Sequence, residues 1–317
     1  MNQITDIRDQ AHLSGSEVKK LNFIKNSKTL VFRKYFRSGL RSHIFEVLLA
    51  GDVSKETQGE IIDGIRMFPR ARPVKMFRIL RNRFETKEAV FREIKKYNTL
   101  LKFLGPDLIA CSEEFMADYT GGKKNQIVLC GLQEYVEGQI LDPWRLFGDN
   151  YLMDLFLSMP RGGSSLPAEV AQAKAAQAEI AQAEVAQAEV AQAEIAQAIV
   201  KTAKKNIATF VERIRQMITQ TGYIPDLAGI GNLILTPSGA LKLVDINNIV
   251  EVKSSDTILL DDKGYPSCDV SIEVLSILER DILKRNISND DPLYLFFLSP
   301  ERKKRVTAIE NEFYANL

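Results

Sequence analysis

Residues 222–248 read GYIPDLAGIGNLILTPSGALKLVDINN, and this stretch decides how the chain is interpreted. Two short apolar runs, 233–235 and 241–244, flank the turn sequence Thr-Pro-Ser-Gly. Proline and glycine suit a tight reversal, so the runs predict an antiparallel hairpin. In a hairpin, the residues just before the first strand and just after the second lie at the same end. We therefore expect Asn232 and Asp245 to lie close together.

These two side chains carry oxygen atoms that suit a hard cation. Mg²⁺ takes most of its ligands from water and substrate phosphates, so the amide of Asn232 and the carboxylate of Asp245 are a sufficient protein contribution. Asp226, shortly upstream, is placed to orient or deprotonate an attacking hydroxyl. A simpler interpretation stays open for each residue, because Asp is common in turns and Asn can cap a local turn.

The segment resembles the protein kinase-like superfamily, in which a catalytic loop H-R-D-L-x-x-x-N precedes a D-F-G motif. Residues 226–232 resemble the catalytic loop, and residues 245–247 resemble D-F-G. Ile224 and Pro225 replace the histidine and arginine of that loop, and its Asp-to-Asn separation of five becomes 232 − 226 = 6. Glycines within the loop can absorb the additional residue.

The sequence upstream supplies further parts in the order of that family. The strand-like run 73–80 carries Lys75 and precedes a helical pattern over about 86–104 that contains Glu93. The separation, 93 − 75 = 18, is close to that of the strand lysine and helix glutamate whose ion pair positions ATP phosphates in kinases. Lys34, on another strand-like run, is a rival for the strand lysine.

Residues 126–138, QIVLCGLQEYVEG, form a buried-strand pattern whose end resembles the hinge between kinase lobes. The resemblance implies that backbone groups around Glu134 and Val136 contact adenine. The glycine-rich loop G-x-G-x-x-G of the family has no match. The nearest candidate is 38–47, in which Gly39 is the one glycine.

The sequence therefore predicts an α+β, bilobal protein kinase-like fold with a small β-rich N-lobe and a mainly helical C-lobe. The N-lobe covers 1–132 and contains a nucleotide-binding β-sheet plus the helix 86–104. The hinge is 133–138. The C-lobe covers 139–317 and contains the catalytic hairpin 222–248.

A five-residue repeat, AEVAQ and its variants, interrupts the C-lobe at 168–197. Alanine, glutamate and glutamine favour helix, and neither glycine nor proline breaks the run. A step of five residues advances a helix by about 140° beyond a full turn, so the apolar residues spiral around it and form no seam. We interpret the repeat as a helical insertion that is dispensable for chemistry. The alternative is an arm for a protein partner or for self-association.

Charge is unevenly distributed along the 317 residues, although the net charge is only +1. Residues 1–105 hold 22 Lys and Arg against 11 Asp and Glu, which leaves 20 against 30 for the remainder. A basic first third would attract nucleotide phosphates, and equally nucleic acid or an anionic membrane surface. Aromatic residues are not interleaved with the basic ones in an RNA-binding pattern, so we rank nucleic-acid binding low.

The N-terminus lacks an apolar signal core, and no apolar run approaches the roughly 20 residues that span a bilayer. Three cysteines without metal or redox spacing fit a reducing compartment. We therefore expect a cytoplasmic protein without a transmembrane segment.

The resemblance implies an ATP- and Mg²⁺-dependent phosphotransferase whose acceptor, a protein hydroxyl or a small molecule, is open. In it, Asp245 and Asn232 hold the metal, Lys75 paired with Glu93 steadies the phosphates, and Asp226 orients the acceptor. One alternative is a pseudokinase, a nucleotide-binding or scaffolding module without efficient catalysis. Another is an unrelated α+β protein.

Overall fold

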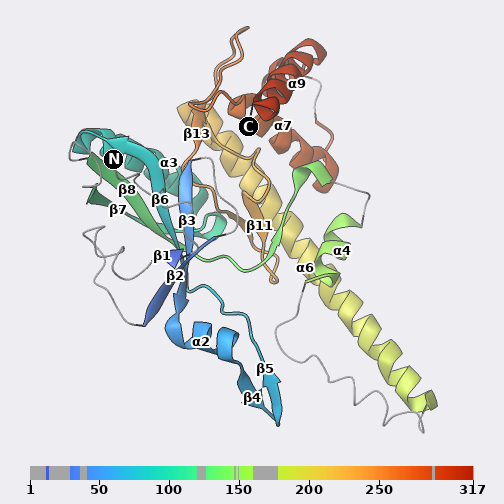
Figure 1. Cartoon of the computed structure of the whole chain (residues 1–317). Coiled ribbons are helices and arrows are strands. Elements are labelled where there is room, and N and C mark those ends of the chain that lie inside the picture. The colour runs from blue at the N-terminus through green and yellow to red at the C-terminus, as the bar shows by residue number, and fades with distance from the viewer. Residues whose placement is uncertain are drawn as a thin grey trace. The chain divides into compact units, whose positions relative to one another are not determined.

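The computed structural model describes residues 12–13, 29–35, 41–119, 126–145, 148, 150–159, 178–287 and 290–316, with only the backbone for 12–13, 119 and 178–192. The protein is mixed α and β, with a β-rich N-terminal region and a helical C-terminal part (Figure 1). It divides into two compact units. The first comprises Met1–Leu101 and Ala110–Tyr135, and the second comprises Lys102–Ile109 and Val136–Leu317.

The first unit is built on a six-stranded sheet in which every neighbouring pair is antiparallel. Its strand order is β1-β2-β3-β6-β8-β7, so β8 lies between β6 and β7. The strands are β1 (His12–Leu13), β2 (Leu30–Lys34), β3 (Ser42–Leu49), β6 (Lys75–Phe84), β8 (Gln126–Glu134) and β7 (Ser112–Tyr119).

The two faces of this sheet differ in what they contact. One face holds an apolar cluster that includes Phe45, Phe77 and Ile79. On the other face, Leu80 packs with Val90 of helix α3 (Lys87–Leu108). Because side chains alternate along a strand, positions 76, 78 and 80 of β6 point toward α3, and positions 75, 77 and 79 point away.

Helix α3 begins one residue after the expected start of 86. It has a kink at Gly105, whose φ of 70° lies in the left-handed region, and Pro106 follows. Glycine reaches this conformation without the strain that a side chain causes. The kink comes directly after residue 104, where the helical pattern in the sequence ends.

A helix and a small hairpin lie between β3 and β6, and the sequence analysis gave no expectation for them. Helix α2 (Ala50–Gln58) leads into β4 (Glu60–Ile62) and β5 (Ile65–Met67). Asp63 and Gly64 join the two strands with φ of 50° and 81°. Two positive φ values are the signature of a type I′ turn, for which Asp-Gly is a preferred sequence.

The second unit combines helices with two small sheets. Strands β9 (Gln139–Ile140), β11 (Leu233–Leu235) and β12 (Leu241–Leu243) form one sheet, and β10 (Tyr223–Pro225) pairs with β13 (Ile249–Glu251). The helices are η2 (Pro143–Arg145), α4 (Tyr151–Leu157), α6 (Ala178–Thr221), α7 (Ser267–Ile277), the π-helical turn η3 (Leu278–Ile282), α8 (Pro292–Phe297) and α9 (Pro300–Ala315).

Helix α6 contains the described part of the repeat and continues without a break to Thr221. The repeat from 178 onward therefore extends a core helix, whereas the sequence led us to expect an insertion between two helices. The absence of a helix breaker in this stretch explains the continuity. Residues 168–177 lie outside the described ranges. Further along, α6 buries Ala203, Ile207 and Phe210 completely.

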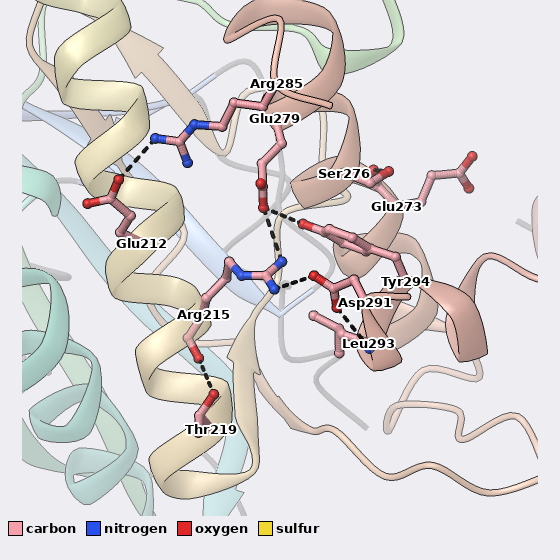
Figure 2. A network of polar contacts seen from close by, with 10 residues as sticks. All are labelled: Glu212, Arg215, Thr219, Glu273, Ser276, Glu279, Arg285, Asp291, Leu293 and Tyr294. Atoms are coloured by element: carbon pink, nitrogen blue, oxygen red, sulfur yellow. Dashed lines mark hydrogen bonds and ion pairs between the residues drawn. The ribbon is translucent and has the colours of Figure 1, made fainter. Parts of the chain in front are cut away.

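A polar network joins α6 to η3 and α8 (Figure 2). Arg215 forms ion pairs with Glu279 and Asp291, and its guanidinium lies 5.1 Å from the centre of the Tyr294 ring. The Tyr294 hydroxyl donates to Glu279 at 2.6 Å. Burial, followed by this hydrogen bond, raises the pKa of Tyr294. These charged groups connect three parts of the second unit, namely α6, η3 and α8.

Candidate functional site

The hairpin expected around residue 238 is present. Strands β11 and β12 pair antiparallel, with Leu233 opposite Leu243. The N–H of Val244 donates to the carbonyl of Asn232 at 2.8 Å. Asn232 therefore lies beside the residue that precedes Asp245, at the same end of the hairpin.

The side chain of Asn232 organises the loop that leads into β11. It is only 9% exposed, and its Nδ2 donates to the carbonyl of Asp226 at 3.0 Å. A Cβ atom on Gly229 would lie 2.7 Å from both Nδ2 and Oδ1 of Asn232, so only glycine leaves room here. The glycines at 229 and 231, the latter with a φ of 96°, fold the loop around the amide. This accommodates the additional residue between Asp226 and Asn232.

Both carboxylate oxygens of Asp226 accept hydrogen bonds. Oδ1 accepts from the N–H of Ala228 at 2.9 Å, and Oδ2 accepts from Nδ2 of Asn248 at 2.8 Å. The N–H of Asp226 also donates to the carbonyl of Asn248 at 2.7 Å. The arrangement fixes the orientation of the carboxylate, and it occupies lone pairs that a general base would use.

Asn248, Ser267 and Ser271 support this loop, and sequence reasoning missed all three. The Ser271 hydroxyl accepts from the N–H of Leu227 at 3.0 Å, and Nδ2 of Asn248 lies 3.5 Å from the Ser267 hydroxyl. A signal existed for Asn248, which directly follows the segment 245–247. The serines stand out only as polar residues within the apolar helix α7.

Asp245 is half-buried. Its Oδ1 accepts from the N–H of Asn247 at 3.3 Å. Within the described ranges, Oδ2 of Asp245 and Oδ1 of Asn232 accept no hydrogen bond.

The metal site expected at these two residues stays a prediction. The described part of the chain contains no group of three or more His, Cys, Asp or Glu that could hold a metal ion. One carboxylate and one amide nevertheless fit Mg²⁺, because this ion keeps water and substrate phosphates as ligands.

In the first unit, the described residues show no ion pair between Lys75 and Glu93. Lys75 is the exposed first residue of β6, and its position in the strand alternation places it on the face of the sheet that points away from α3. The Glu93 carboxylate pairs with Lys96, one turn further along α3, at 2.9 Å. The rival Lys34 is half-buried on β2, opposite Phe45. The ion pair between Lys75 and Glu93 stays a prediction.

A different cation of β6 lies on the face toward α3, and sequence reasoning missed it. Arg78 is only 4% exposed and forms an ion pair with Glu114 of β7, whose side chain is 5% exposed. Arg78 Nη2 also lies 3.4 Å from the Ser112 hydroxyl. Its Nε and Nη1 have no hydrogen-bond partner in the described structure. The signal was a charged residue within the apolar run Phe-Arg-Ile-Leu.

Gly131 makes the contact between Arg78 and Glu114 possible. The three residues lie opposite one another on β6, β8 and β7. A Cβ atom on Gly131 would lie 2.8 Å from Nη2 of Arg78 and from Oε1 of Glu114, and 2.6 Å from the Ser112 hydroxyl. The two charged side chains therefore meet over a residue that has no side chain. Burial raises the pKa of the neighbouring Cys130.

The residues expected at the hinge lie where β8 ends. Glu134 is the last residue of β8, and its N–H donates to the carbonyl of Cys111 at 2.8 Å. Val136, 9% exposed, is the first residue after the boundary between the two units. The chain thus passes from one unit to the other within 133–138. Gly39 lies outside the described residues.

Trp144 contacts the loop that contains Asp226. Its indole Nε1 donates to the carbonyl of Ala228 at 3.4 Å, and the residue is 40% exposed. A tryptophan used only for packing would be more buried. Trp144 therefore presents a solvent-exposed side chain beside this loop.

Comparison with protein-family models and with curated proteins finds no match for this chain. Among the described helices, none has the length and apolar character needed to cross a membrane. A functional assignment therefore rests on two groups of side chains. One is Asp226, Asn232 and Asp245 at the hairpin, and the other is Arg78 with Glu114 in the six-stranded sheet.

Proposed function

We propose that the chain is an ATP- and Mg²⁺-dependent phosphotransferase with a bilobal, protein kinase-like fold. The observation that carries the proposal is the hairpin end, where Asn232 and Asp245 each keep an oxygen atom that accepts no hydrogen bond from the described residues. Asp226 lies in the loop that these residues organise. This combination fits the catalytic loop and the D-F-G segment of the protein kinase-like superfamily that the sequence resembles.

The order of elements in the first unit supports the same proposal. Counting from β2, β6 is the third strand of its sheet, and α3 follows it directly. In kinases the phosphate-binding lysine lies on the third strand and its glutamate partner on the next helix. Lys75 lies on β6 and Glu93 lies on α3, which are the corresponding elements, although Glu93 forms its ion pair with Lys96. Arg78 is the alternative cation, because it lies on the face toward α3.

In this proposal, Asp245 and Asn232 hold Mg²⁺ through their unpaired oxygens. The bound ion would neutralise charge on the transferred phosphoryl group. Asp226 orients the acceptor hydroxyl from a fixed position, because Ala228 and Asn248 hold its two oxygens. Backbone groups around Glu134 and Val136 contact adenine. The acceptor is a protein hydroxyl or a small molecule.

A second candidate function is nucleotide binding or scaffolding without efficient catalysis. It is favoured by the two hydrogen bonds on the Asp226 carboxylate and by the engagement of Arg78 with Glu114. A base whose lone pairs are occupied removes a proton less readily. The three free cysteines support a cytoplasmic location for either function.

The test is ATP turnover by the purified chain with Mg²⁺, with and without candidate acceptors. Asp245→Asn and Asp226→Asn should each abolish turnover, and Asp154→Asn, an exposed carboxylate of the same unit, should not. Nucleotide binding without turnover would establish the second function instead. Neither binding nor turnover in a folded sample would identify an unrelated α+β protein.

A further inference from the structure

The β4–β5 hairpin concentrates exposed apolar side chains. Ile61, Ile62 and Ile65 are 67%, 50% and 60% exposed, and Met67 and Phe68 are also exposed. The hairpin extends beyond α2, away from the six-stranded sheet of the same unit (Figure 1). Clustered exposed apolar side chains mark a surface that another molecule covers.

The apolar side chains occur on both faces of this hairpin. In the pairing register, Ile62 lies opposite Ile65, and Ile61 lies opposite Arg66. Alternation places Ile62, Ile65 and Met67 on one face and Ile61 on the other. A flat protein surface covers only one face of a thin hairpin, whereas lipid surrounds an inserted tip on all sides.

Cationic residues follow the exposed apolar side chains of the hairpin, whereas its turn carries Asp63. Residues 66–75 hold four Lys and Arg and no Asp or Glu. Arg70 has a 71% exposed side chain and only a 3.7 Å ion pair to Glu46, and Arg72 and Lys75 are also exposed. Exposed apolar side chains beside a cationic segment match a bilayer with anionic headgroups.

We propose that the exposed apolar side chains of residues 61–68 insert into an anionic lipid surface, with the cationic residues of 66–75 in contact with the headgroups. The outer edges of a two-stranded hairpin carry unpaired backbone groups, which are costly in hydrocarbon. The turn between the strands also carries the exposed carboxylate of Asp63, which has to stay among the headgroups. Insertion is therefore shallow and ends near the headgroup boundary. This peripheral attachment goes beyond phosphoryl transfer and does not depend on it.

The test is co-sedimentation of the full chain with vesicles of phosphatidylcholine, with and without phosphatidylglycerol. The chain should sediment with the phosphatidylglycerol vesicles and stay in solution with the neutral ones. About 1 M salt should release it, because the screening length falls to roughly 3 Å. Ile65→Trp should add a fluorescence component that shifts to shorter wavelength with anionic vesicles only.

Three variants separate the parts of the proposal. Ile61→Ser with Ile65→Ser should lower vesicle partitioning by more than about tenfold, because two large apolar side chains no longer leave water. Arg70→Gln with Arg72→Gln should weaken the preference for anionic lipid. The control, Leu260→Ser with Leu295→Ser, removes apolar residues that are 50% and 65% exposed in the second unit and should bind as wild type.

Thermal melting of each variant is the control for folding. We expect the fold to be retained, because the hairpin substitutions lie at exposed positions. The proposal is overturned if the wild type ignores both vesicles, or if the hairpin substitutions leave partitioning unchanged. Equal binding to neutral vesicles would also contradict it. A dimer in sedimentation velocity that the Ile61 and Ile65 substitutions abolish, without lipid binding, would assign the hairpin to a second copy of the chain.

Discussion

The side-chain amide of Asn248 donates to Oδ2 of Asp226 at 2.8 Å, and the two residues share a backbone hydrogen bond of 2.7 Å. Asn248 follows the segment that carries Asp245. The same segment therefore carries the proposed metal ligand and fixes the carboxylate proposed to orient the acceptor. Asn232 adds a second connection, because it contacts the backbone of Asp226.

We expect Asn248→Ala to lower the free energy of unfolding by about 1–3 kcal/mol, because Asp226 Oδ2 loses a buried donor. The measurement is urea unfolding of the variant and the wild type. Asn316→Ala, which removes an exposed hydrogen bond in α9, should change the value by less than about 0.5 kcal/mol. Equal effects of the two substitutions would contradict the structural role of Asn248.

Gly131→Ala should destabilise the first unit by about 1–3 kcal/mol, because a methyl group cannot fit between Ser112, Arg78 and Glu114 without moving them. The matched control is Gly51→Ala in α2, where a Cβ atom meets nothing within 4 Å and φ is not positive. Alanine favours helix, so the control should leave stability unchanged or raise it by up to about 1 kcal/mol. Thermal and urea unfolding of both variants measure the difference.

Arg78→Met should cost about 3–5 kcal/mol of stability, because it leaves Glu114 as an unpaired buried charge. The double substitution with Glu114→Met should recover much of this loss. Lys75→Ala, at an exposed position of the same strand, should change stability by less than about 0.5 kcal/mol. A double variant no more stable than Arg78→Met would show that the two side chains are not coupled in this way.

Burial raises the pKa of Cys268 to about 12 from the ordinary 9.0, and it also raises that of Cys130. At pH 8 only about one in 10⁴ of Cys268 is the reactive thiolate. A thiol reagent should therefore label the half-buried Cys111 first in the native protein, and all three cysteines after unfolding. Fast native labelling of three thiols would contradict the burial.

The same shift gives a pH dependence of stability. The folded pKa of Cys268 exceeds the unfolded one, so the folded state binds more protons between pH 9 and about 12. The contribution of this pKa shift to the free energy of unfolding is complete below pH 9 and is lost as the pH rises toward 12. Urea unfolding at increasing pH above 9 should show this decrease in stability, and Cys268→Ala should make it shallower. An unchanged slope in that variant would assign the decrease to other groups.

Local sequence signals located the hairpin and the helix after β6. Pro237 and Gly239 identify the turn, and the kink at Gly105 coincides with the end of the apolar helical pattern. The strand cation was harder to find, because Lys75 and Arg78 differ in the face that they occupy. That difference depends on the register of β6 against its neighbours, which the spacing to Glu93 does not encode.

Contacts distant in sequence were also beyond prediction. Ser271 lies 44 residues from Leu227, whose N–H it accepts, and no local pattern indicates that pairing. For residues 178–197 of the repeat, the helix predicted from composition is confirmed. Its continuity with α6 requires knowing that no turn intervenes after residue 197.

The most direct test of the account is a thermal-shift titration with ATP, with and without Mg²⁺, on the wild type and on Asp245→Asn. The account predicts a Mg²⁺-dependent rise in the melting temperature that the variant loses, because Asp245 supplies the only carboxylate of the proposed metal site. The same rise in the variant, or no rise in a folded wild-type sample, would contradict it.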